Sequence, residues 1–269
     1  MYVELTFFQV SLASLLIVIN GVISITLRLR MEKSLVIASL RTVVQLLLVG
    51  LILEWVFRLD RWYIVLALAT VMTLIAGVTA AGRNERRYPG IWINTIISVW
   101  VSAWIVTSFA LFAVMHGIEK WYQPQYAIPL LGMVLGNTLN GISVGLSTFT
   151  DSLVTKREQV ETLLALGATR WEAARSPVQH AVRTGMIPII NSMMVVGIVS
   201  LPGMMTGQLV SGMEPIEAVK YQIVIMFLVA SATAMGTVGI VVLSFRRLFN
   251  ADHQFVFHLL TKKGESQPA

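Results

Sequence analysis

Long apolar runs recur along this chain, and each is long enough to cross a lipid bilayer as a helix. The hydrocarbon core of a bilayer requires about 20 mostly apolar residues per helix. Seven runs meet this length: residues 5–27, 35–57, 62–81, 91–114, 127–149, 185–211 and 219–245. Only 13% of the residues are charged, against about 25% in soluble domains. We therefore predict an all-α polytopic membrane protein with about seven transmembrane helices, in which residues 1–269 form one domain.

Basic residues mark one side of this predicted membrane domain. Of the 20 Lys and Arg residues, 15 lie in three alternate connections and the tail, at 28–34, 82–90, 150–184 and 246–269. Because Lys- and Arg-rich loops face the cytoplasm, we predict an external N-terminus and a cytoplasmic tail. A nucleic-acid-binding protein would not distribute its charge over alternate loops. The net charge of +6 thus indicates membrane topology, and we expect the lipid bilayer, not nucleic acid, as partner.

Several catalytic classes lack their signatures in this sequence. The chain has no Cys and four His residues, and no His pair has a common zinc-site spacing. The motifs GxSxG, HExxH and GxxxxGK[ST] are absent. We therefore expect no enzymatic activity and no cofactor bound by this chain, and in particular no ATP hydrolysis through a phosphate loop.

The connection at residues 150–184 is predicted to contain a bent amphipathic helix. Apolar residues fall at helical spacing on one face, and these are Val160, Leu163, Leu164, Gly167, Trp171 and Ala174. Gly167 suits a left-handed C-terminal cap, and Thr169 with Glu172 forms a capping-box pattern that starts a new helix. We also expect Ser176 and Pro177 to start a further helix. This face would lie on lipid headgroups or dock on a cytoplasmic partner, and the two alternatives use the same residues.

The same segment carries part of a known docking motif. Permeases of ABC transporters contact their ATPase through a segment with the pattern E-A-A-x-x-x-G, and Glu161 and Gly167 match its Glu and Gly, whereas Thr162 and Leu163 replace the two alanines. The stretches IPLLGMVLGN (128–137), LLALGAT (163–169), SLPGMMTG (200–207) and IEAVKYQIVIMF (216–227) resemble the FetB (YbbM) family. This family comprises ABC permeases linked to iron export, with plant relatives tied to aluminium tolerance.

The resemblance implies a multi-pass permease in the plasma (inner) membrane. It implies a homodimer of permease chains, a separately encoded ABC ATPase that holds ATP and Mg²⁺, and a metal-ion cargo, with iron as the expected ion. The ATPase would dock on eight residues of the bent helix: Glu158, Glu161, Leu163, Leu164, Gly167, Thr169, Arg170 and Trp171. The alternative is a secondary transporter or channel that works without an ATPase. Seven spans without an evident inverted repeat disfavour this alternative.

Polar residues within the apolar runs are the first candidates for a transport pathway. Asn137, Asn140 and Asn191 could be metal ligands, although interhelical hydrogen bonds are the commoner use of such residues. Glu54 could form an outer gate, although Arg58 four residues later favours an ordinary ion pair. The glycines of the fifth run (Gly132, Gly136, Gly141 and Gly145) have the G-x-x-x-G spacing of close helix packing.

The segment SLPGMMTG combines a helix break with two methionines. Pro202 and Gly203 would interrupt the sixth run, and broken helices in transporters mark hinges and substrate sites. Five methionines carry soft thioether sulfurs, which suit Cu(I) better than iron, so we expect packing to be their main role: Met133, Met193, Met194, Met204 and Met205. We therefore predict a hinge or gate at Pro202–Gly203, and the metal ligands stay unassigned.

Overall fold

The computed structural model describes residues 6–114 and 120–262, and it confirms an all-α membrane-type architecture. The long helices are α1 (Phe7–Thr26), α2 (Glu32–Leu59), α3 (Trp62–Gly82), α4 (Ile91–Phe109), α5 (Pro124–Thr155), α7 (Arg170–Val195) and α9 (Pro215–Leu248). The shorter elements are β1 (Arg86–Arg87), a π-helical turn (Ala110–Val114), α6 (Arg157–Ala165), α8 (Gly203–Val210), a 3-10 turn (Phe257–Leu259) and β2 (Thr261–Lys262).

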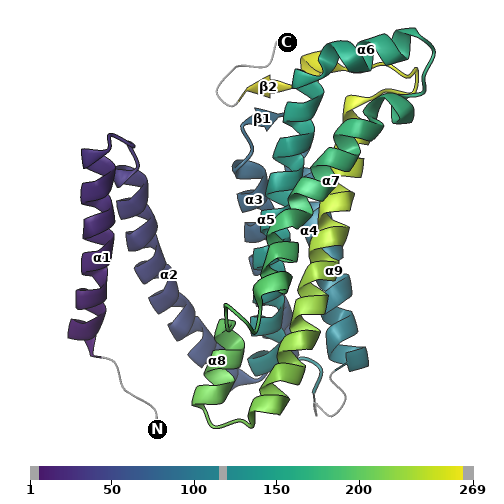
Figure 1. Ribbon diagram of the computed structural model, residues 1–269. Helices are drawn as coiled ribbons and strands as arrows, with labels where there is room; N and C mark the ends of the chain where they lie inside the picture. The colour runs from purple at the N-terminus through teal and green to yellow at the C-terminus, as the bar shows by residue number, and fades with distance from the viewer. Residues whose placement is uncertain (1–5, 115–119, 263–269) are drawn as a thin grey trace.

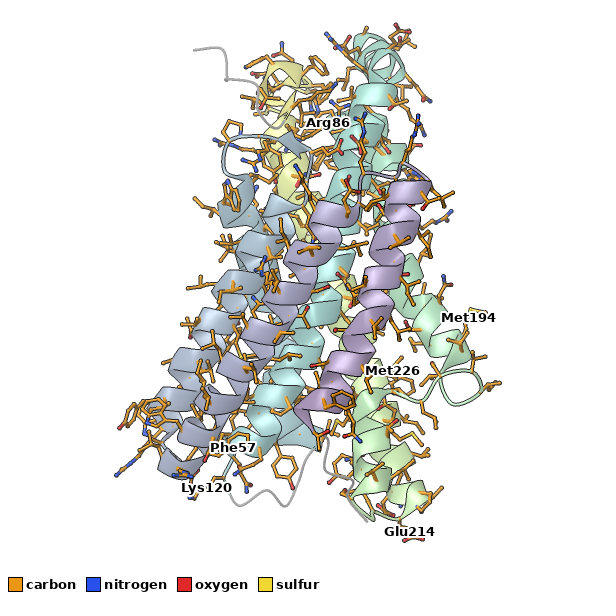
Figure 2. The ribbon with its side chains drawn as sticks, turned by 90° about the vertical axis from the view of Figure 1, so that its left-hand side faces the viewer. Phe57, Arg86, Lys120, Met194, Glu214 and Met226 are labelled. Atoms are coloured by element: carbon orange, nitrogen blue, oxygen red, sulfur yellow. The ribbon has the colours of Figure 1, made fainter. Side chains whose placement is uncertain are left out.

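Five helices form the body of the molecule, with α5 packed against α3, α4, α7 and α9 (Figure 1). Connections at the two ends alternate, so that Arg86 lies at one end and Lys120 and Glu214 lie at the other (Figure 2). Helix α6 and the folded C-terminal segment cap the end that carries Arg86. The basic connections therefore gather at one end of the bundle, as the charge pattern predicts, and we call it the basic end.

Glycines allow α5, α7 and α9 to approach closely at the centre of the bundle. A Cβ atom added to Gly185 would lie 2.8 Å from the carbonyl oxygen of Gly141 and 2.6 Å from Thr237 Cγ2. A Cβ atom on Gly145 would lie 2.7 Å from the same methyl group. The predicted packing role of Gly141 and Gly145 is thus confirmed. Gly136 differs, because an added Cβ would meet no atom within 4 Å.

The sixth of the seven predicted runs is not one continuous helix. Among the described residues, six helices are long and apolar enough to cross a membrane. The sixth predicted run, 185–211, is split between the end of α7, a non-helical stretch at 196–202, and the short helix α8. Polar residues on α7 reduce its mean hydropathy, and Gly197 adopts a left-handed φ of +83° that ends helical geometry. The predicted sixth span is therefore divided between two helices.

The predicted helix start at Ser176–Pro177 is also wrong. Helix α7 runs without interruption from Arg170 to Val195, through both Pro177 and Pro188. A proline inside a helix costs about 3 kcal/mol. Here its neighbours Ala174, Val178 and Ala181 are buried against the body. This packing is available only in the folded chain, and it outweighs the local preference of the Ser-Pro pair.

The first two helices form a hairpin that stands apart from the body (Figure 1). Ser24 closes its turn, because its hydroxyl donates to Glu32 Oε2 at 3.1 Å and accepts from the Met31 N–H at 3.0 Å. The hairpin meets the body near the end of α2, where Val56 is buried with Val65 of α3. Almost all of its other side chains are exposed in the single chain, and their apolar character fits contact with lipid or protein.

Candidate functional site

The turn between α6 and α7 has the geometry that its sequence predicts. Helix α6 ends at Ala165, and Gly167 adopts a φ of +91° that closes the C-terminal cap. Thr169 then caps α7, since Glu172 accepts from the Thr169 N–H and hydroxyl at 2.7 Å each, and the Glu172 N–H donates to Thr169 Oγ1 at 3.3 Å. These hydrogen bonds lower the pKa of the Glu172 carboxyl below its ordinary value. The helix–turn–helix prediction is confirmed.

The C-terminal segment holds this turn in place, which the sequence did not indicate. The Arg170 N–H donates to His253 Nδ1 at 2.9 Å, and the Arg170 guanidinium donates to the Asn250 carbonyl at 3.0 Å. The Arg157 guanidinium lies 4.0 Å from the centre of the Phe257 ring. Residues 249–262 thus pack against α6 and the turn, whereas the sequence predicted only a cytoplasmic tail. The C-terminal segment is short and has few apolar residues at helical or strand spacing, so its sequence gives no signal of such a contact.

The apolar face of the bent helix is mostly covered by the chain itself. Val160 is 1% exposed, and Leu163 and Leu164 pack against the main hydrophobic core. Trp171 is half exposed and meets Phe245 edge to face, with ring centroids 5.4 Å apart. Part of the segment stays exposed, and we call five of its exposed residues the turn surface: Glu158, Glu161, Leu166, Gly167 and Thr169.

Leu166 is the feature of the turn surface that the sequence analysis missed. Its side chain is 79% exposed at the tip of the turn. Beside it on α6, Glu161 forms an ion pair with Arg157 at 2.7 Å. A leucine held outward by a capped turn, with carboxylates on the preceding helix, is a small apolar contact point near polar surface, and protein–protein interfaces commonly combine an apolar centre with a polar rim.

A second candidate region lies at the other end of α7, where two pockets meet. The larger has a volume of about 460 Å³ and the smaller about 340 Å³, and they share Val196, Gln222 and Met226. Five methionines from four helices line the two pockets: Met133 on α5, Met193 on α7, Met204 and Met205 on α8, and Met226 on α9. Four of the five methionines singled out in the sequence therefore come together with Met226, whereas Met194 is 72% exposed and is not among the residues that line these pockets.

Gln222 is the polar residue that sequence reasoning did not find in this region. It lies on α9, is 6% exposed, and lines both pockets. Its Oε1 atom has no hydrogen-bond partner among the described residues. A buried amide oxygen without a partner is costly, so Gln222 is positioned to accept a hydrogen bond or to bind a ligand. A lone amide in an apolar run has no spacing pattern by which to recognise it.

The break between α7 and α8 forms one wall of the larger pocket. Pro202 is the N-cap of α8 and Gly203 is its first residue, and both line the pocket. The interruption predicted at Pro202–Gly203 is confirmed, but it begins earlier. The backbone leaves the helix at Val196, and Gly197 makes the left-handed turn. Non-helical backbone at membrane depth is tolerated where it is buried in protein or lines water.

Of the other predicted pathway residues, three lie outside these pockets and one lines the larger pocket. Glu54 pairs with Arg58 at 2.5 Å on the exposed surface of α2. Asn140 accepts a hydrogen bond from the Arg83 guanidinium at 2.8 Å. Asn191 is exposed on α7 and lines neither pocket. Asn137 does line the larger pocket, and its amide donates to the Met133 carbonyl of its own helix at 2.9 Å.

The chemistry of the pockets is soft and uncharged. None of the described residues that line either pocket is charged. In the part of the chain that the structure describes, no three His, Asp or Glu side chains gather as a metal site. Thioethers and amides can contact a metal ion, but hard ions prefer carboxylates. The pocket residues alone therefore do not define a site for a hard cation.

These features define a multi-pass, α-helical membrane protein with a broken helix beside an uncharged pocket. Residues 7–249 match the family described as UPF0014, an uncharacterised protein family. The chain belongs to this family. No solved structure shows a significant match to it.

Three relatives illustrate the range of similar proteins. The chain is 38% identical to the UPF0014 membrane protein slr1647 of Synechocystis over 85% of this chain and 88% of that protein. It is 31% identical to the "Probable iron export permease protein FetB" of Escherichia coli, over 95% of this chain and 96% of the other. It is 29% identical to the protein ALUMINUM SENSITIVE 3 of Arabidopsis thaliana, over 93% and 90% of the two chains. The resemblance to the FetB family is thus confirmed.

Proposed function

We propose that this chain is the membrane permease subunit of an ABC exporter, with a metal ion, most simply iron, as its cargo. The full-length similarity to a protein named as an iron export permease supports the cargo assignment. The exposed, capped turn between α6 and α7 carries the proposal of an ATPase partner, because it presents Glu161 and Gly167 of the docking motif outside the bundle. In this proposal two copies form the permease in the plasma membrane.

The proposed ATPase holds ATP and Mg²⁺ and docks on the turn surface at the basic end. Leu166 enters a groove on the ATPase, and Glu158 and Glu161 contact its rim. Movement of the docked ATPase is transmitted along α7, which is one continuous helix from Arg170 to Val195. At 1.5 Å per residue this helix is about 39 Å long. It ends at the broken segment beside the methionine-lined pockets, so the turn and the pockets are joined by a single rigid element.

A secondary transporter or channel is the main rival, and it would have no use for the turn surface. In that case the turn would lie on lipid headgroups. The covered apolar face argues against this alternative, because Val160, Leu163 and Leu164 pack on the body rather than face a lipid surface. A helix that binds headgroups needs a broad exposed apolar face.

Co-purification with an ABC ATPase encoded in the same genome tests the proposal. We expect Gly167→Ala and Glu161→Lys each to reduce the co-purified ATPase, and the ATP turnover of the complex, at least tenfold. Two matched controls lie at the opposite end of the bundle. Gly212 has a φ of +92°, close to that of Gly167, and Glu217 pairs with Lys220 as Glu161 pairs with Arg157.

Gly212→Ala and Glu217→Lys should leave assembly unchanged. Equal losses in the two pairs of variants, or no loss in either, would refute docking at the turn surface. Uptake of ⁵⁵Fe into inverted membrane vesicles tests the cargo separately, and it should require ATP and the ATPase subunit. ATP-independent uptake would favour the secondary transporter.

A further inference from the structure

Helix α5 exposes a polar stripe along its length, although it lies at the centre of the bundle. Four polar side chains alternate with small or apolar ones at spacings of three and four residues, which place them on one face. The stripe comprises Met133, Gly136, Asn137, Asn140, Val144, Ser147 and Asp151, all of them exposed or half exposed. The opposite face of α5 is buried, with Val134, Ile142 and Leu146 at 0% exposure.

This stripe is unsuited to contact with lipid. Polar side chains in hydrocarbon are costly and almost always face a water-filled cavity or another helix. Within the described residues Asn137 bonds to its own helix through the Met133 carbonyl. Gly136 beside it has no atom within 4 Å of an added Cβ position. The exposed surfaces of neighbouring α4 are different, since Ile97, Val101 and Ile105 present apolar side chains.

The stripe connects two features at opposite ends of the bundle. At one end Met133 and Asn137 line the larger methionine-lined pocket. At the basic end, two arginines from the connection between α3 and α4 reach across the stripe. Arg83 donates to Asn140 at 2.8 Å, and Arg86 forms an ion pair with Asp151 at 2.7 Å. Ser147 also donates to Asp151, at 3.3 Å.

We propose that the polar stripe of α5 lines an aqueous pathway, which leads from the methionine-lined pocket to the basic end and is closed there by the Arg86–Asp151 ion pair. This inference rests on the proposed transport function, since only a transported cargo would need such a path. A second copy of the chain supplies the opposite wall. The broken segment at 196–202 borders the same pocket, and non-helical backbone at this depth needs protein or water beside it.

Cysteine accessibility tests the pathway directly. The native chain contains no Cys, so each single-cysteine variant carries one thiol at a known position. Asn137→Cys, Asn140→Cys and Ser147→Cys report on the stripe. Ile97→Cys, Val101→Cys and Ile105→Cys are the controls, because they are exposed positions on an apolar surface of α4 that we expect to face lipid. Each variant is reconstituted in liposomes and treated with a charged, membrane-impermeant methanethiosulfonate. A thiol reacts as its thiolate, which forms readily only in contact with water.

We expect the stripe positions to react at least tenfold faster than the α4 controls. A membrane-permeable maleimide, applied after unfolding in detergent, confirms that every cysteine can be labelled. Slow reaction at both sets would show that the stripe faces lipid, and it would overturn the pathway. Slow aqueous reaction together with efficient cross-linking between stripe cysteines of two copies would show a packed interface, and it would overturn the pathway as well.

The closing ion pair is tested with a cysteine reporter at position 140. Asp151→Asn combined with Asn140→Cys should raise the labelling rate from the basic end several-fold. Glu54→Gln, which breaks the exposed pair with Arg58, is the control and should have no effect. An unchanged rate in the Asp151 variant would refute the closure. These measurements need neither ATPase nor cargo, so their failure is distinct from failure of the docking experiment.

Discussion

Gly136 and Gly141 lie five residues apart on α5, and their surroundings are opposite. A methyl group on Gly141 would lie 2.4 Å from Thr233 Cγ2 and 3.2 Å from the Gly185 carbonyl oxygen. The same group on Gly136 would meet nothing within 4 Å. The G-x-x-x-G spacing in the sequence is the same in both halves of α5, so the sequence cannot say which half packs against another helix of the same chain.

Alanine substitution should separate the two glycines. Alanine favours a helix over glycine by about 1 kcal/mol, so Gly136→Ala should leave the apparent melting temperature in detergent unchanged or raise it. Gly141→Ala gains the same propensity but overpacks the α5–α7–α9 contact, which costs about 1–3 kcal/mol. We therefore expect a lower melting temperature for Gly141→Ala only. Equal shifts in the two variants would contradict the close packing at Gly141.

Other single residues show that the sequence reveals the chemistry of a side chain more reliably than its position in the fold. Four of the methionines singled out in the sequence line the two pockets, and the structure adds Met226 and Gln222 to them. Both additional residues lie on α9, and only the tertiary fold brings them to the methionines of α5, α7 and α8. Asn140 was singled out for its chemistry, but its partner Arg83 is 57 positions away along the chain.

At the scale of elements, capping patterns of a few adjacent residues correctly predicted where helices end and begin. The capping box of Thr169 and Glu172 and the left-handed Gly167 each depend on a few adjacent residues, and each is present as predicted. The Ser176–Pro177 start failed because buried packing of α7 overrides the local preference. The amphipathic face of α6 was recognised, but a sequence cannot tell whether a face is covered by its own chain or by a partner. Here Val160 packs on the chain itself.

The cap of α7 gives this element a defined response to pH. Hydrogen bonds from Thr169 lower the pKa of Glu172, so the ionised carboxylate stabilises the folded cap. This stabilisation is fully present above the ordinary glutamate pKa of about 4.3. It is lost as the pH falls through the lower folded value. The emission of the adjacent Trp171, obtained as the difference from Trp171→Phe, should therefore change with a midpoint below 4.3.

Glu172→Gln provides the control for this titration, because its amide does not ionise. The transition should be absent in this variant. A midpoint at or above the ordinary glutamate value, or the same transition in Glu172→Gln, would show that the capping hydrogen bonds do not form.

At the scale of the whole molecule, the break between α7 and α8 carries strongly exposed apolar side chains. Among the described residues Ile198 is the most exposed large apolar side chain, at 88%, and Val199 is 79% exposed. Figure 2 shows Met194 projecting from the side of the bundle just before the break. Polar backbone and large apolar side chains meet here, and neither lipid nor water alone suits both. A second copy of the chain would cover this surface in the proposed dimer.

Cross-linking in native membranes tests this arrangement. Ile198→Cys treated with a short bismaleimide should yield a product of two 29.7 kDa copies. Ile105→Cys, at a position on α4 that is 52% exposed and that we expect to face lipid, should remain monomeric under the same conditions. Equal yields at the two positions would indicate random collision, and the proposed interface would then be wrong.

The arginines that border the α5 stripe also set the electrostatic work of moving a charge past it. Asp151 balances Arg86, but Asn140 is neutral and leaves the charge of Arg83 uncompensated by its partner. Arg83 is exposed, so solvent screens part of its charge, but it still repels a cation that passes close to it. A metal ion that follows this path would therefore pass Arg83 with less electrostatic work if ligands mask its charge.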